Sequence, residues 1–155
     1  MIVADSSPLI ALARIGQLDL LHEIYEAVVI PPAVEDEIER HPRGFEGSRP
    51  PWIKLHWIEN PSTVASFRNH LHRGESEVLA LGVQLRLPVL LDEADGRRVA
   101  FAAGLAVVGT LGVLILGKRQ GMLERVDPEI SRLQAEGFRI SPGLIAEALR
   151  LAGEA

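Results

Sequence analysis

The sequence has no cysteine, and this absence excludes several kinds of chemistry at once. Without thiols the 155-residue chain can form neither a disulfide framework nor a thiolate zinc site, and it has no cysteine nucleophile. Its fold must be held by a hydrophobic core, for which a content of 47% hydrophobic residues is sufficient. An intracellular setting is consistent with this composition.

Long apolar runs are also lacking. No stretch approaches the roughly 20 apolar residues that a membrane-spanning helix needs. Asp5, Pro8 and Arg14 interrupt the N-terminal segment, which has no basic residues ahead of its apolar ones, so no signal peptide is expected. We therefore expect a soluble, cytoplasmic protein. Because no repeat, low-complexity segment or linker divides the chain, residues 1–155 are predicted to form a single domain.

Positive charge is in deficit, with a formal net charge of −5. This balance argues against a broad basic face of the kind that holds duplex DNA by neutralising its phosphates. If the partner is a nucleic acid, bound cations must contribute to the attraction.

Short apolar runs alternate with amphipathic segments along the whole chain. Strands are predicted at residues 2–4, 28–30, 52–58, 89–91 and 105–108. Helices are predicted at 8–14, 18–25, from 32, from 61, at 75–86, at 94–103 and from a turn at 109–110 to 118, with two more before the end. Residues 41–51 are rich in Gly, Pro and charge and are predicted to form an exposed loop. This alternation predicts an α/β fold, a three-layer α/β/α sandwich around a mainly parallel sheet.

Four acids occupy positions where carboxylates can converge. Asp5 and Asp92 each follow an apolar strand directly, and ligands of open parallel sheets bind outside the carboxyl ends of the strands. Glu75 precedes Val78 by three residues, which places it on the apolar side of its helix, and Glu37 has the same relation to the apolar side of its own helix. Glu77 and Glu75 do not share a face, and Glu77 is expected to point away.

Carboxylates on buried faces are costly unless they are paired or bind a metal, and gathered carboxylates raise each other's pKa. A divalent cation removes both costs. Oxygen ligands without cysteine favour Mg²⁺ or Mn²⁺. Such an ion can lower the pKa of an attacking water and neutralise charge that develops on a phosphate, so the pattern indicates phosphodiester hydrolysis.

The segments that carry these acids resemble PIN-domain proteins, particularly a branch of short prokaryotic, toxin-type (VapC-like) ribonucleases. The similar segments are VADSSPLIALARIGQLDLL, VVIPPAVEDEI, GESEVLALG, LPVLLDEADGRRVA, GLAVVGTLGVLILGKRQG and GFRISPGLIAEAL, which cover nearly the whole chain. The resemblance implies a metal-dependent endoribonuclease that uses Mg²⁺ or Mn²⁺. Its four acidic positions, which bind the ions and are catalytic, fall on Asp5, Glu37, Glu75 and Asp92.

The resemblance also implies partners: an RNA substrate, a second copy of the chain in a homodimer, and a small antitoxin protein. Arg73, Arg97 and Arg98 flank the expected site and are predicted RNA contacts, although solvated charged faces show the same pattern. The histidines are not expected to form a zinc site, since His70 and His72 are two residues apart and face different ways on a helix.

Two of the acidic positions leave alternatives open. At the third position the family more often has aspartate, and both Glu75 and Glu77 are available. At the fourth, Glu93 and Asp95 are lesser candidates beside Asp92. Asp95 could instead cap the next helix, and Ser6 is expected to cap the first.

These irregularities motivate an alternative function, a catalytically inactive PIN-like module that binds RNA or protein. A phosphatase or receiver domain is a weaker third possibility, because it too places aspartates at strand ends.

Overall fold

The computed structural model describes residues 1–45 and 48–155. Its strands are β1 (Ile2–Ala4), β2 (Val28–Ile30), β3 (Ile53–Leu55), β4 (Val89–Leu90) and β5 (Val107–Val108). Its helices are α1 (Ser6–Arg14), α2 (Asp19–Tyr25), α3 (Pro32–Arg40), α4 (Pro61–Arg68), α5 (Arg73–Leu85), α6 (Ala94–Ala102), α7 (Thr110–Arg119), α8 (Asp127–Ala135) and α9 (Pro142–Leu151).

The strands form one parallel sheet in the order β3-β2-β1-β4-β5. The chain moves outward from β1 to β3, then returns across the sheet to β4 and β5. Right-handed crossovers therefore place α1 to α3 on one face and α4 to α6 on the other. The predicted three-layer α/β/α fold is confirmed, and the strand order reverses between β1 and β4, which is where open sheets bind ligands.

The predicted element boundaries differ from the structure mainly at helix starts. Helix α1 begins at Ser6 instead of Pro8, and α5 begins at Arg73 instead of Glu75. The strand predicted over residues 52–58 is limited to β3, because the chain beyond Leu55 has little apolar partner surface. Within the loop predicted over 41–51, Phe45 is buried, and residues 46 and 47 lie outside the described part of the chain.

The core lies between the sheet and its helices. Strands β1, β2 and β4 are buried throughout, which explains why they are continuous apolar runs without alternation. Helix α5 packs on β1 and β4, and α2 packs on β2. No helix in residues 1–45 and 48–155 has the length and apolar character to cross a bilayer.

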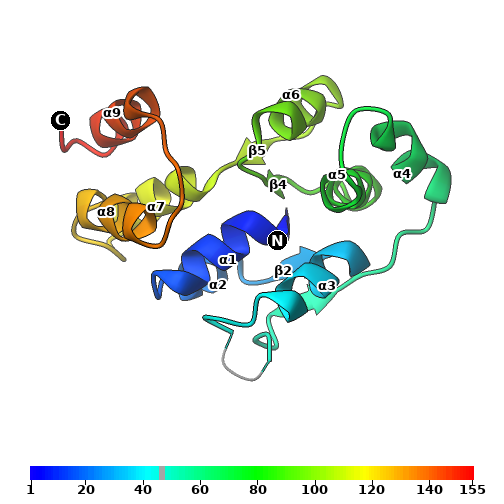
Figure 1. Cartoon of the computed structure of the whole chain (residues 1–155), viewed down its shortest axis with the longest axis horizontal. Helices are drawn as coiled ribbons and strands as arrows, with labels where there is room; N and C mark the ends of the chain where they lie inside the picture. The colour runs from blue at the N-terminus through cyan, green and yellow to red at the C-terminus, as the bar shows by residue number, and fades with distance from the viewer. Residues whose placement is uncertain (46–47) are drawn as a thin grey trace.

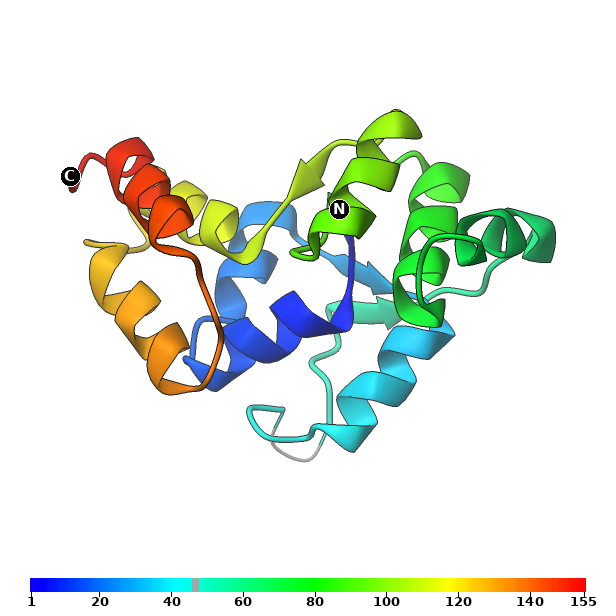
Figure 2. The same ribbon diagram turned by 45° about the horizontal axis from the view of Figure 1, so that its top comes forward.

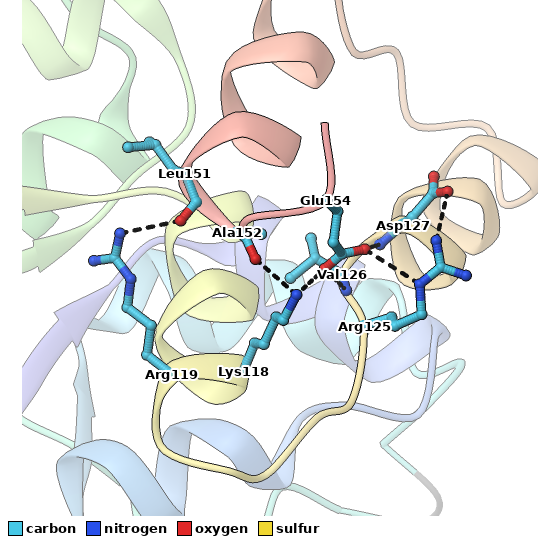
Figure 3. Close-up of polar contacts among 8 residues, drawn as sticks. All are labelled: Lys118, Arg119, Arg125, Val126, Asp127, Leu151, Ala152 and Glu154. Carbon is cyan, nitrogen blue, oxygen red and sulfur yellow. Dashed lines mark hydrogen bonds and ion pairs between the residues drawn. The ribbon is translucent and has the colours of Figure 1, made fainter.

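The C-terminal helices α7, α8 and α9 lie together at one end of the molecule, opposite α4 and α5 (Figure 1). Turning the view shows α8 (orange) beside the N-terminal helices, which are far from it in sequence (Figure 2). A carboxylate near the end of the chain joins the C-terminal helices to one another (Figure 3). Glu154 accepts hydrogen bonds from the backbone N–H groups of Val126 and Asp127, at 2.8 and 3.0 Å, and from Lys118 at 2.9 Å.

Candidate functional site

Asp5 lies at the carboxyl end of β1, where the strand order reverses. Its backbone N–H donates to Leu90 O of the neighbouring strand β4 at 3.0 Å, and its carboxylate accepts from the Ser6 N–H at 2.8 Å. Asp5 therefore caps α1 itself, and the expectation that Ser6 is the capping residue is wrong. Only 7% of Asp5 is exposed to solvent.

The electrostatic surroundings of Asp5 bring together the four acids predicted from the sequence. The pKa of Asp5 is raised from 3.8 to about 6, mainly by burial and in part by the negative charges of Glu75, Asp92 and Glu37. The hydrogen bond from Ser6 acts in the opposite direction. Like charges around a buried carboxylate are the arrangement for which a cation is the natural partner.

Asp5 opens onto a cleft of about 640 Å³. Three of the predicted acids line it, and so do several basic side chains and one aromatic ring. The lining residues include Asp5, Glu37, Glu75, Arg14, Arg40, His41, Arg73, Gly74 and Phe138. The cleft thus offers both carboxylate oxygens and donors for an anion.

The first turn of α5 brings Glu75 to the cleft. Gly74 lies against Asp5, since a Cβ atom at Gly74 would be 3.6 Å from Asp5 Oδ1. The Glu75 carboxylate accepts from the His72 backbone N–H at 3.0 Å in a capping box. Glu75 therefore lines the site while one of its oxygens holds the start of α5.

Glu77, the alternative third acid, does not line the cleft but is buried beneath α3. Its carboxylate accepts from the Ala33 N–H at 3.1 Å and from Arg73 Nε at 2.8 Å. Only 7% of Glu77 is exposed. Glu77 is thus absent from the cleft lining, and it is buried because α3 covers the side of α5 that carries it. Glu77 supplies the cap that Pro31, at the start of α3, cannot.

Glu37 lies in the last turns of α3, at the rim of the cleft. Its carboxylate is 3.7 Å from His41 Nε2 and 4.0 Å from Arg40 Nη1, and 42% of the side chain is exposed. This exposure leaves Glu37 free to move towards a ligand in the cleft.

Asp92 lies two residues beyond β4, next to the cleft but not in its lining. Its carboxylate accepts from the Thr110 backbone N–H at 2.7 Å and from Thr110 Oγ1 at 2.5 Å. It thereby caps α7, whose own N-cap residue, Gly109, has no side chain. A Cβ atom at Gly109 would lie 2.7 Å from Arg97 Nη1 and 2.9 Å from Asp92 Oδ1, so a larger residue would displace these two side chains. Thr110, which is 5% exposed, was not predicted as a site residue.

A family profile described as a PIN domain matches residues 1–154. The chain belongs to the PIN-domain family. PIN domains are generally nucleases, act on nucleic acids and are typically dependent on divalent metal ions. Neither the comparison with curated proteins nor the comparison with solved structures gave a match.

The lesser acidic candidates of this PIN domain have local partners. Glu93 accepts from the Gly96 N–H at 2.8 Å and caps α6, so the alternative in which Asp95 caps this helix is wrong. Asp95 forms an exposed ion pair with Arg98. Capping fully explains the position of Glu93.

The three predicted RNA contacts differ in their surroundings. Arg73 lines the cleft and pairs with Glu77 and, at 3.6 Å, with Asp36. Arg97 donates to Leu91 O at 3.0 Å, beside the end of β4. Arg98 is exposed on α6 and paired with Asp95. Arg73 is therefore at the cleft, and Arg97 is at the end of β4, next to Asp92.

The donor set fits a hard divalent cation in its chemistry, because all four acids supply carboxylate oxygen and Asp5 is buried among negative charges. Among residues 1–45 and 48–155, no three His, Asp or Glu side chains are grouped closely enough to hold an ion as they stand. Each of the four carboxylates instead faces a protein donor. Asp5 and Glu75 each use one oxygen for this contact, whereas both oxygens of Asp92 accept from Thr110.

Proposed function

We propose that this PIN domain is a metal-dependent endoribonuclease that hydrolyses phosphodiester bonds in RNA. One observation carries the proposal: a carboxylate that is 7% exposed, with its pKa raised to about 6, lies at an open cleft among three further acids. Burial of this carboxylate among like charges is costly to the fold, and perturbed carboxylates in a cleft are a mark of function.

In this proposal Asp5, Glu37, Glu75 and Asp92 hold Mg²⁺ or Mn²⁺, with Glu93 and Asp95 as lesser candidates. The bound ion supplies a water of lowered pKa and neutralises charge on the phosphate. The Ser6 N–H orients Asp5, and Thr110 orients Asp92, as groups behind metal ligands commonly do. Arg73, Arg97 and Arg98 bind phosphates along the strand and position it without reading its sequence.

A second candidate function is a PIN-like module that binds RNA or protein without cleaving it. The hydrogen bonds from Thr110 to Asp92 favour this candidate, because both oxygens of this carboxylate already have donors within the protein. Metal affinity separates the two functions.

Calorimetric titration of Mn²⁺ and Mg²⁺ into the metal-free protein tests the proposal. We expect binding by the wild type, loss of binding in the Asp5→Asn, Asp92→Asn double variant, and a parallel loss of cleavage of labelled RNA. Asp19→Asn, which changes an exposed acid in α2, is the matched control and should behave as the wild type.

If the double variant still cleaves RNA in a metal-dependent manner, the carboxylate assignment is wrong. If the wild type binds RNA but no metal, the non-catalytic module is the correct function.

The motifs shared with short prokaryotic toxin-type ribonucleases support finer proposals. The whole chain acts as one cytoplasmic nuclease domain, and it is the toxin of a toxin–antitoxin pair that forms a homodimer and is inhibited by a small antitoxin. Exposed apolar side chains, among them Trp57 and Leu144 at 69% and 53%, are available for such contacts. Light scattering and the neighbouring reading frame are the direct checks.

A further inference from the structure

The cleft is also lined by residues of α1 and of the segment after α8. Arg14 is the last residue of α1, and Phe138 lies between α8 and α9. The Arg14 guanidinium carbon is 5.8 Å from the centre of the Phe138 ring, and both residues line the cleft. Helix α1 thus begins at the Asp5 carboxylate and ends at this cation–aromatic pair.

Arg14 differs from the other cations of the cleft in its pairing. Arg40 and His41 face Glu37, and Arg73 faces Glu77 and Asp36. Within residues 1–45 and 48–155, Arg14 has no acidic partner, and its Nε atom is buried without a hydrogen bond. The Nε atom itself is covered, but Arg14 as a whole is partly exposed and its charge has no acidic partner, so an anion that enters the cleft can pair with the guanidinium.

The position of Phe138 is fixed from two sides. At the end of α8, Glu136 pairs with Arg43 at 2.9 Å. At the start of α8, Glu154 accepts from the backbone N–H groups of Val126 and Asp127 (Figure 3). The ring is therefore held against α1 before any ligand arrives, which lowers the entropic cost of stacking a base on it.

We propose that Arg14 and Phe138 form a binding subsite for one nucleotide of single-stranded RNA. Arg14 binds a backbone phosphate, and Phe138 stacks with a base, as aromatic and guanidinium groups do in single-strand recognition. At a rise of about 1.5 Å per residue, Arg14 is about 13 Å along α1 from Asp5. Arg14 and Asp5 thus belong to opposite ends of α1.

This subsite rests on the proposed function, since it assumes that RNA occupies the cleft. Its test is fluorescence anisotropy of a labelled ten-nucleotide single-stranded RNA, with Ca²⁺ as the only divalent ion. Kd is measured over a range of KCl concentrations for the wild type, Arg14→Gln and Phe138→Leu. The controls are Arg150→Gln and Phe101→Leu, which change exposed residues of α9 and α6.

We expect Arg14→Gln to raise Kd about tenfold and to lower the slope of log Kd against log salt by about 0.7, the value for one phosphate contact in a single strand. Phe138→Leu should raise Kd about tenfold with an unchanged slope, because stacking is not ionic. Both controls should match the wild type. Calorimetry should give unchanged Mn²⁺ affinity in Arg14→Gln.

If Arg14→Gln raises Kd but leaves the salt slope unchanged, Arg14 only supports the fold, and this result overturns the subsite. If Arg14→Gln does not fold, Arg14→Met replaces it. This variant keeps a long side chain against the Phe138 ring but removes the charge, so the salt slope should again fall by about 0.7, and an unchanged slope overturns the subsite. A wild type that binds and cleaves RNA with both variants unaffected removes the subsite alone, whereas a wild type that binds no RNA removes the ribonuclease proposal as well.

Discussion

At the scale of single residues, Asp5 shows how the site and the stability of the fold oppose each other. Burial and the neighbouring acids raise its pKa to about 6, so at neutral pH the folded protein holds a charge that the unfolded chain would hold more easily. The contribution of protonated Asp5 to the stability of the fold is complete below pH 3.8, the pKa of this group in the unfolded chain. This contribution is lost as the pH rises from 3.8 through about 6, the pKa in the folded protein.

We therefore predict that Asp5→Asn stabilises the metal-free protein at pH 7, by about 3 kcal/mol at most, because asparagine carries no charge but can still accept from Ser6. Urea unfolding in EDTA should show that the free energy of unfolding of the variant differs from that of the wild type by a large amount at pH 7 and by a small amount near pH 4. Adding Mn²⁺ should then stabilise the wild type only. An equal difference at both pH values would contradict the raised pKa.

At the scale of the elements, the contact between Asp92 and Thr110 joins the end of β4 to the start of α7. Thr110→Val removes the hydroxyl donor and keeps the backbone one. We predict a loss of about 1 kcal/mol in stability. We also predict roughly tenfold weaker Mn²⁺ binding, because Asp92 loses the group that orients it. Thr63→Val, in α4, is the matched control. Unchanged Mn²⁺ affinity in Thr110→Val would show that Asp92 needs no such support.

The elements also show how much could be predicted from the sequence. The predicted bounds of β1 and β2 match the structure, because each short apolar run ends sharply, at Asp5 and at Pro31. Asp5 and Asp92 follow from this, since an acid directly after a buried strand must emerge at the sheet edge. The starts of α1 and α5 were located less well, because capping depends on side-chain orientation and not on periodicity alone.

The parts of the site that could not be predicted depend on contacts between distant segments. Glu77 is buried because α3 covers its side of α5, and the period of α5 carries no information about α3. Arg14 and Phe138 meet although they belong to opposite ends of the sequence. Helical spacing identifies neighbours within one element, so it detects the acids one by one but not the surface that they share with the C-terminal segment.

At the scale of the whole molecule, the Glu154 side chain links the C-terminal helices α7 and α8 to the end of the chain after α9. Its side chain is 5% exposed and lies between Lys118 of α7 and the first backbone N–H groups of α8 (Figure 3). Burial alone would raise its pKa, but the hydrogen bonds from Val126, Lys118 and Asp127 lower it from 4.5 to about 2. Because its pKa is lowered, the Glu154 carboxylate contributes to the stability of the fold above pH 4.5, and this contribution is lost as the pH falls towards 2.

We predict that Glu154→Gln destabilises the fold at pH 7, because the amide removes the charge and places donors against donors. The expected loss is about 1 to 3 kcal/mol, measured by urea unfolding. The difference from the wild type should shrink as the pH falls below 4.5, where the wild-type carboxylate is itself protonated in the unfolded chain. Glu124→Gln, an exposed change in the segment before α8, should leave both curves unchanged. A difference that persists undiminished at low pH would show that packing, and not charge, holds the C-terminal end against the rest of the molecule.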